Sequence, residues 1–374
     1  MRNSRRLPVF LCFVAAGVAA VLIYSCIPPS SFRAVKEPRS GAALAEHVAI
    51  VYSKYYQIDL AGMEKLHPFD INKYAKIYLQ MNMDGLIQPE DVYVPGEISK
   101  EDILLVHTEG YLQDLKNSKK VAQYLEAGFV SLAPPKLLDL SILRAFRYAA
   151  GGTLLASRLA LEYGIAVNLG GGYHHAEPGR GGGFCIYADM PIAIRRLQKE
   201  GLIKRALVID LDVHQGNGTA ECFKGDDSVF TFSMHEGDIY PFPKADSDMD
   251  IELEAGDGDD IFIETLGVYL PVVFDRARPD LVFYQAGVDP LAEDPLANLE
   301  MTPGGIARRD EMVIDACVRR GVPVVMCLGG GYSENAWKVQ YGSIRNIIEK
   351  YGLVGAERRH PSRPPSLKEK LYTK

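Results

Sequence analysis

Cysteine is scarce in this chain, and its spacing excludes a metal site of the zinc-finger type. The sequence of 374 residues contains six cysteines and one tryptophan. No two of the cysteines have zinc-finger spacing. Four of them stand mostly in apolar stretches, where we expect buried free thiols: Cys185, Cys222, Cys317 and Cys327.

An excess of positive charge and internal repeats are also missing. The formal net charge is −7, so we expect no positively charged surface for binding nucleic acid. An acidic surface is compatible with a cationic substrate. The 24% of charged and 47% of hydrophobic residues are ordinary values for a globular protein with a large core.

One long apolar run, at residues 7–24, differs from the rest of the chain, and three arginines precede it. This order is typical of a signal peptide, and the run is about as long as the shortest membrane-spanning helices, roughly 17 residues. We predict that residues 1–26 are a signal peptide, a lipoprotein signal with lipid on Cys26, or a membrane anchor. A buried N-terminal helix is the remaining interpretation. The expected location is therefore outside the cytoplasm or at a membrane, in a bacterial periplasm or cell envelope.

The rest of the chain divides by composition into three parts. Residues 27–45 are rich in proline, serine and charge and are predicted to be a linker. Residues 46–356 are predicted to form the catalytic domain, and residues 357–374 a basic, proline-containing tail.

Short apolar runs alternate with helical stretches within the domain. The runs lie at 48–52, 165–169, 206–209, 281–284 and 322–326, and helices are expected at 192–201 and 303–320. Continuous apolar strands separated by helices are typical of a parallel sheet that is covered on both faces. We therefore predict one α/β domain with a central, mainly parallel sheet flanked by helices. Such sheets bind ligands at the carboxyl ends of their strands.

Three polar residues two apart follow one of these strands: Asp210, Asp212 and His214. Residues at this spacing share a strand face. Buried carboxylates are costly unless they are paired or bind a cation, and carboxylate and imidazole ligands suit zinc. A capped loop with solvated acids is the alternative interpretation.

The ends of three other strands carry further candidates. His174 and His175 follow three glycines, and adjacent histidines on such a turn can approach one centre, although a structural role is also open. Asp289 could be a further metal ligand. Tyr332 follows a second run of three glycines and could supply a catalytic hydroxyl rather than only packing.

Together these segments resemble the zinc-dependent histone deacetylases of the arginase/deacetylase superfamily. The resemblance rests on GGGYHHA at 170–176, DLDVHQGNGT at 210–219, QAGVD at 285–289 and GGGY at 329–332. It extends from about His47 to about Gly352 in the family's order, and HPFD at 67–70 and VHT at 106–108 add to it. The segment RGGGFCIYAD at 180–189 and Asn217 are most similar to the class IV branch.

The resemblance implies a role for each matching residue. Metal ligands would be Asp212, His214 and Asp289; catalytic residues would be His174, His175, Tyr332, Asp210 and Asn217; substrate-binding residues would be Tyr173, Gly183, Phe184, Gly330 and Gly331. Structural potassium would be bound by backbone oxygens of Asp210, Asp212, His214, Ser233 and Met234. Many relatives have aspartate in place of Asn217, and a neutral amide supports an imidazolium less than a carboxylate does.

The implied function is a zinc-dependent amide hydrolase that removes acetyl or longer acyl groups from lysine or similar amines through a metal-activated water, with one zinc ion per chain. Three alternatives remain: a hydrolase of acylpolyamines or other small amides, an arginase-like two-metal hydrolase, and a non-catalytic tethered binder of acyl ligands. Gly216, two residues after His214, offers no side-chain ligand for a second metal. The N-terminal segment argues against histones as substrates.

Overall fold

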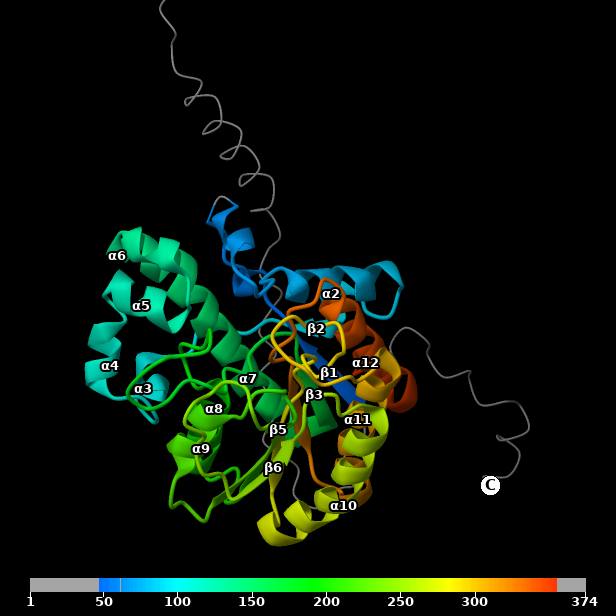
Figure 1. Cartoon of the computed structure of the whole chain (residues 1–374). Helices are drawn as coiled ribbons and strands as arrows, with labels where there is room; N and C mark the ends of the chain where they lie inside the picture. Colours follow the sequence, from blue (N-terminus) through cyan, green and yellow to red (C-terminus); the bar gives the residue numbers. More distant parts are fainter. Residues whose placement is uncertain (1–46, 61, 355–374) are drawn as a thin grey trace, which may run out of the picture. The chain divides into compact units, whose positions relative to one another are not determined.

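A parallel sheet of eight strands forms the centre of the domain (Figure 1). The structure, a computed structural model, describes residues 47–60 and 62–354. The strand order is β2-β1-β3-β8-β7-β4-β5-β6, and every neighbouring pair is parallel. The strands are β1 (His47–Val51), β2 (Val92–Tyr93), β3 (Gly164–Asn168), β4 (Ala206–Asp210), β5 (Val229–Glu236), β6 (Met249–Leu253), β7 (Leu281–Gln285) and β8 (Val324–Cys327).

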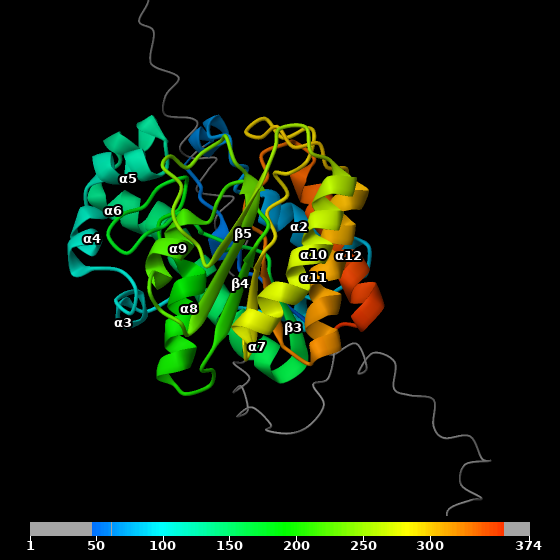
Figure 2. The ribbon, with the colours of Figure 1, turned by 60° about the horizontal axis from the view of Figure 1, so that its bottom comes forward.

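Helices cover both faces of this sheet. One layer contains α7 (Arg144–Tyr163), α8 (Asp189–Lys199) and α9 (Asn217–Phe223), and the other contains α10 (Asp259–Ala277), α11 (Pro303–Arg320), α12 (Ala336–Tyr351) and α2 (Lys73–Met83) (Figure 2). Shorter helices lie between β2 and α7: α3 (Lys100–Ile103), α4 (Glu109–Asp114), α5 (Ser118–Tyr124) and α6 (Pro135–Leu137).

The alternation of side chains along the strands explains the two layers. In β7, Val282 and Tyr284 belong to one hydrophobic cluster, whereas Leu281 and Phe283 belong to the other. Successive residues of a strand point to opposite faces. A strand that is apolar at every position must therefore be covered on both sides, as the continuous apolar runs predicted.

Helix α11 illustrates how local signals define an element. The Thr302 side chain accepts a hydrogen bond from Gly305 N at 3.0 Å, and Pro303 occupies the first turn. The helix ends at Arg320, and Gly321, which follows it, has a φ of 63°, the left-handed conformation that glycine adopts easily. A capping threonine, an N-terminal proline and a C-terminal glycine are standard helix boundaries, and the predicted range of 303–320 is confirmed.

The predicted fold is confirmed, but three of the strands carried no clear signal. β2 has two residues, β6 is a partly exposed edge strand, and β5 ends in the polar residues His235 and Glu236. In β5 these polar side chains are buried, because the strand lies between two others. The four cysteines of the domain are free thiols, of which three are buried and Cys222 is half-buried.

The predictions for residues 1–45 and 357–374 fall outside the described residues. This includes the signal or anchor at 7–24, the lipid site at Cys26 and the resulting location, all of which stay predictions. Among residues 47–60 and 62–354, no helix is both long enough and apolar enough to span a bilayer.

A buried ion pair between Arg309 and Asp310 of α11 connects the helical layer to the sheet. Arg309 donates to Leu211 O at 3.0 Å and to Gly287 O at 2.7 Å, just beyond β4 and β7. Asp310 accepts from Arg309 Nε at 2.9 Å and from the hydroxyls of Tyr284 and Ser343. Helices α11 and α12 are thereby joined to the strand ends.

We predict that Asp310→Ala lowers the free energy of unfolding by about 3–5 kcal/mol, because it leaves the buried Arg309 charge without an opposite charge. Urea denaturation of the purified protein measures this change. The matched control is Arg319→Ala on the same helix, which removes an exposed ion pair to Asp315 and should change stability little. A similar loss in both variants would contradict a special contribution from the buried pair.

Candidate active site

The register of the sheet brings four strand ends to one level. Asp210 of β4 is paired with Gln285 of β7, Gln285 with Cys327 of β8, and Cys327 with Asn168 of β3. The segments that follow these strands therefore leave the sheet along the same edge. This is why candidates that lie far apart in the sequence meet in space.

Three of these candidates form a compact group of possible metal ligands. Among the described residues, Asp212, His214 and Asp289 are the group whose ligand atoms all lie within 4.8 Å of one another. His214 Nδ1 lies 3.2 Å from Asp212 Oδ1 and 3.2 Å from Asp289 Oδ2. Ligands about 2.0–2.1 Å from a tetrahedral metal ion are roughly 3.3 Å apart. The three donor atoms thus have the spacing that a four-coordinate cation requires.

Backbone groups hold the two carboxylates in place. Asp212 Oδ2 accepts a hydrogen bond from Gly330 N at 2.8 Å, and Asp289 Oδ1 accepts one from Val213 N at 2.9 Å. A Cβ at position 330 would lie 2.1 Å from Asp289 Oδ2 and 2.7 Å from Asp212 Oδ2. Only glycine permits this close approach of the backbone to the ligands.

The electrostatics of the group also favour a cation. The pKa of Asp289 is raised to about 7, first by burial and then by the charge of Asp212. Burial alone would lower the pKa of His214, but hydrogen bonds to Asp212 and Asp289 outweigh it and raise that pKa to about 10. Without a metal ion the group therefore retains a proton, and a metal cation at the same place would satisfy both carboxylates.

The two adjacent histidines have opposite environments. His174 Nδ1 lies 2.8 Å from Asp210 Oδ2, and His175 Nδ1 lies 2.7 Å from Asn217 Oδ1. Burial disfavours the charge on both, but Asp210 and then Asp212 raise the pKa of His174 to about 9. Burial and the charges of His174 and His214 hold the pKa of His175 well below its usual range. One imidazole is thus held as a cation and the other as a neutral base, a division typical of acid–base pairs.

Tyr332 lies beside this group, as predicted. Its ring is 6.2 Å from the His214 ring, and its backbone N donates to Asp294 Oδ2 at 2.7 Å. Burial, followed by the charges of Asp289 and Asp212, raises the pKa of its hydroxyl well above the ordinary range. The hydroxyl therefore stays protonated and is available as a hydrogen-bond donor.

Aromatic rings surround Tyr332 and His175. The Phe184 ring is 5.8 Å from Tyr332 and 4.5 Å from the His67 ring. Gly183 has φ +49°, and a Cβ there would lie 2.3 Å from His175 Cδ2. The glycine lets the Phe184 loop pack directly on the imidazole.

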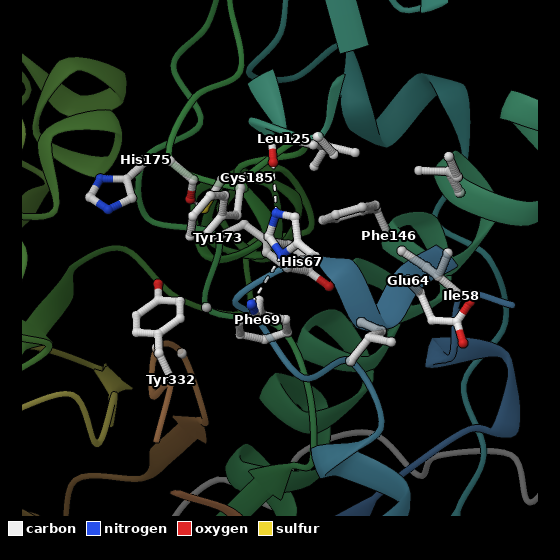
Figure 3. A pocket seen from close by; sticks show the side chains of 18 of the residues that line it. Ile58, Glu64, His67, Phe69, Leu125, Phe146, Tyr173, His175, Cys185 and Tyr332 are labelled. Carbon is white, nitrogen blue, oxygen red and sulfur yellow. Dashed lines mark hydrogen bonds between the residues drawn. The ribbon is translucent and has the colours of Figure 1, made fainter. Parts of the chain in front are cut away.

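A mainly apolar cavity extends away from these residues (Figure 3). Its volume is about 800 Å³ including its open part. Of the predicted substrate-binding residues, Tyr173, Gly183, Phe184 and Gly330 line it, whereas Gly331 does not: a Cβ on Gly331 would meet Val288 and Ala336. Figure 3 shows His175 and Tyr332 at one end and Phe146, Ile58 and Glu64 at the other. Further apolar lining comes from loop and helix residues outside the quoted motifs: Ile58, Leu60, Ile71, Leu125, Ala127, Phe129, Val130, Ile142 and Phe146.

Several residues at the site were missed by the sequence reasoning. Lys73 of α2 is fully buried and donates to Gly329 O at 2.7 Å and Gly330 O at 3.1 Å. Gln285 donates to Gly172 O at 2.9 Å, and the Tyr240 ring is 4.9 Å from the His175 ring. Gln285 stands in a quoted motif, so its position was visible, but a lysine or tyrosine gives no local signal of such a contact.

The predicted potassium ligands belong to the end of β4, the bend after it, and the neighbouring part of β5. Asp210 of β4 is paired in register with Ser233 of β5, and Met234 follows it. The strand face predicted for Asp210, Asp212 and His214 is wrong, because β4 ends at Asp210 and the other two residues lie in a bend. In this bend the Asp210 side chain accepts a hydrogen bond from Asp212 N at 3.2 Å. Potassium binding by these backbone oxygens stays a prediction.

Comparison with known proteins identifies the group to which this site belongs. Residues 67–347 match the histone deacetylase domain. The chain is 39% identical over 310 residues to histone deacetylase 2 of Arabidopsis thaliana, covering 82% of this chain and 80% of that protein. It is 32% identical over 270 residues to the acetoin utilization protein AcuC of Bacillus subtilis, covering 67% and 68%. A solved structure of a histone deacetylase homologue from Aquifex aeolicus superimposes with a TM-score of 0.66 at 25% identity, covering 82% of this chain and 84% of that one. The motifs at the strand ends, the fold and these similarities together show that the chain belongs to the histone deacetylase family, hydrolases that act on amide bonds.

Proposed function

We propose that the chain is a zinc-dependent amide hydrolase that removes acetyl or longer acyl groups from lysine or similar amines. The observation that carries this proposal is the convergence of Asp212, His214 and Asp289 beside an apolar cavity lined by His175 and Tyr332. Membership of the family supports the reaction class. The chemistry of the ligands and the shape of the cavity support the finer assignments to zinc and to the acyl group.

Zinc fits the donor set. One imidazole and two carboxylates are ligands that zinc accepts, and catalytic zinc sites keep a fourth position open beside three protein ligands. When bound, zinc polarises the substrate carbonyl and acidifies a water molecule. In the part of the chain that the structure describes, this is the one group of three possible ligands, which favours a single ion over the two-metal arginase-like alternative. Structural potassium at the end of β4 and beside β5 remains part of the proposal.

His175 is the proposed general base. Asp212 and Asp289 would be anionic ligands and would offset part of the charge of a bound ion, so a base beside the site would be needed to take the proton of the water. His175 is neutral and faces the cavity, so it can take the proton of the attacking water. His174, which Asp210 holds as a cation, is the proton donor for the departing amine.

Tyr332 is the proposed donor to the oxyanion. Its hydroxyl stays protonated and lies at the same end of the cavity as His175 (Figure 3). A donor placed where negative charge develops stabilises the transition state more than the bound substrate. Asp294 positions this residue through the hydrogen bond from Tyr332 N.

The cavity supports acyl groups longer than acetyl. An acetyl group needs only the end beside His175, whereas the apolar wall continues to Phe146 and Ile58. Each methylene group that leaves water for such a wall contributes about 0.8 kcal/mol. We therefore propose that medium or long acyl chains bind along this wall, whether they are carried by a protein lysine or by a small amine.

We predict that Tyr332→Phe retains zinc but slows turnover of an acyl-lysine peptide by a factor on the order of 10²–10³, because one oxyanion donor is lost. The measurement is kcat for the purified variant, with metal analysis of the same sample. Turnover close to that of the unmodified protein would remove Tyr332 from the mechanism.

We predict different metal contents for two histidine variants. His175→Ala should lose activity and keep about one zinc ion per chain, because His175 acts as a base and not as a ligand. His214→Ala should lose zinc, because it removes one of the three ligands. Metal analysis after dialysis separates the two, and zinc loss in His175→Ala would show instead that His175 is a ligand.

We predict that kcat/KM is higher for butyryl and myristoyl than for acetyl peptides, because longer chains bury more apolar surface. Ile58→Trp should lower kcat/KM for the myristoyl peptide at least tenfold and leave the acetyl value within about twofold, since it narrows only the far end of the cavity. Leu79→Trp, on the exposed face of α2, is the matched control. A clear preference of the unmodified protein for acetyl would contradict the proposal about chain length.

A further inference from the structure

A line of polar contacts runs outward from His175 to the protein surface. His175 Nδ1 lies 2.7 Å from Asn217 Oδ1. The Asn217 amide then donates from Nδ2 to Glu177 Oε1 at 3.2 Å. Arg180 donates to both oxygens of Glu177, at 2.7 and 2.8 Å. His175 and Asn217 are buried, whereas the Arg180 side chain is 67% exposed.

The chemistry of these groups fixes the direction of every hydrogen bond. An ionised carboxylate only accepts, so the NH₂ group of Asn217 must face Glu177. The amide oxygen of Asn217 therefore faces His175, and since that oxygen also only accepts, His175 Nδ1 must carry a proton. A neutral imidazole has one N–H, so its lone pair is on Nε2. If the Asn217 amide were flipped, its oxygen would face the Glu177 carboxylate and its NH₂ group would face the N–H of His175. Neither contact would then be a hydrogen bond.

We propose that Glu177 is a positioning residue that sets the tautomer of His175 by orienting the amide of Asn217. The inference rests on the proposed function, in which His175 Nε2 takes the proton of the attacking water. An aspartate at position 217 would need no such help, because both of its oxygens accept. The asparagine has one accepting end and one donating end, so a second group must select between them, and Glu177 is the acceptor within reach of the donating end.

A purely structural role for Glu177 makes a different prediction. The turn that contains Glu177 and Arg180 is already closed by the backbone, where Glu177 N donates to Arg180 O at 2.9 Å. If the ion pair between the Glu177 and Arg180 side chains only stabilised this turn, its loss would change kcat by the same factor whatever residue stands at position 217. The positioning role instead requires that the effect of Glu177 depend on Asn217.

A double-mutant cycle on the zinc-loaded full chain tests this dependence. Glu177→Leu should lower kcat about 3- to 10-fold, the effect of one lost hydrogen bond, with KM, zinc content and melting temperature little changed. Glu177→Gln retains an accepting oxygen and should restore most of the activity. In an Asn217→Asp background, Glu177→Leu should not lower kcat. Glu221→Leu, a matched change at a surface ion pair of α9, should have no effect.

The second readout is the tautomer itself. ¹⁵N NMR of histidine-labelled protein should show His175 protonated at Nδ1 in the unmodified chain, and a mixture of tautomers in Glu177→Leu. An equal loss of kcat with and without the Asn217→Asp substitution, or an unchanged tautomer, would overturn the positioning role. If Glu177→Leu shifted the tautomer but left kcat unchanged, Glu177 would still orient the imidazole of His175, but His175 would not be the base. Absence of deacylase activity in every sample would refute the proposed function. The NMR measurement would still show whether Glu177, through Asn217, sets the tautomer of His175.

Discussion

Two carboxylates buried at the ends of β4 and β7 impose the constraint on which the rest of the site depends. Asp212 and Asp289 are fully buried, and their charges raise each other's energy. Backbone amides of Gly330 and Val213 donate to them, and His214 lies between them. This arrangement favours a cation, so the end of the sheet is a candidate metal site and not only a polar loop.

The surrounding structure serves to keep that arrangement rigid. Arg309 binds the carbonyl groups of Leu211 and Gly287 from behind, so that the segments that carry the ligands are held by one helix. Lys73 binds the carbonyl groups of Gly329 and Gly330 from another helix. Both the lysine and the arginine are buried, and both act on backbone oxygens that flank the ligands or Tyr332. Charged side chains outside the quoted motifs therefore add to the backbone contacts that hold the group in place.

The two histidines show how neighbours of similar sequence acquire different chemistry. His174 contacts the carboxylate of Asp210, whereas His175 contacts the neutral amide of Asn217. A carboxylate stabilises an imidazolium and an amide does so much less, so one histidine is held as a cation and the other stays neutral. In relatives with aspartate at the position of Asn217, the difference between the pKa values of the two histidines would be smaller. Burial and the charges of His174 and His214 keep His175 neutral. Asn217 is an amide with one accepting and one donating end, so its orientation is controlled by Glu177.

The sequence by itself determined the parallel sheet, the strands that bear the motifs, and the identity of the groups that gather at the sheet edge. Continuous apolar runs demand burial on both faces. The spacing of Asp210, Asp212 and His214 identified them as a group at a strand end, but β4 ends at Asp210 and the other two residues lie in the bend that follows. The roles of the individual residues were implied by the resemblance of the motifs to the histone deacetylases. The tertiary structure alone decided the depth and lining of the cavity, the contacts of Lys73 and Arg309, and the link from Asn217 to Glu177. These features join residues far apart in the chain, such as Lys73 and Gly329 at a separation of 256 positions, through the packing of helices on the sheet. A contact of that kind has no period or motif in the chain, because it depends on where two separate elements meet.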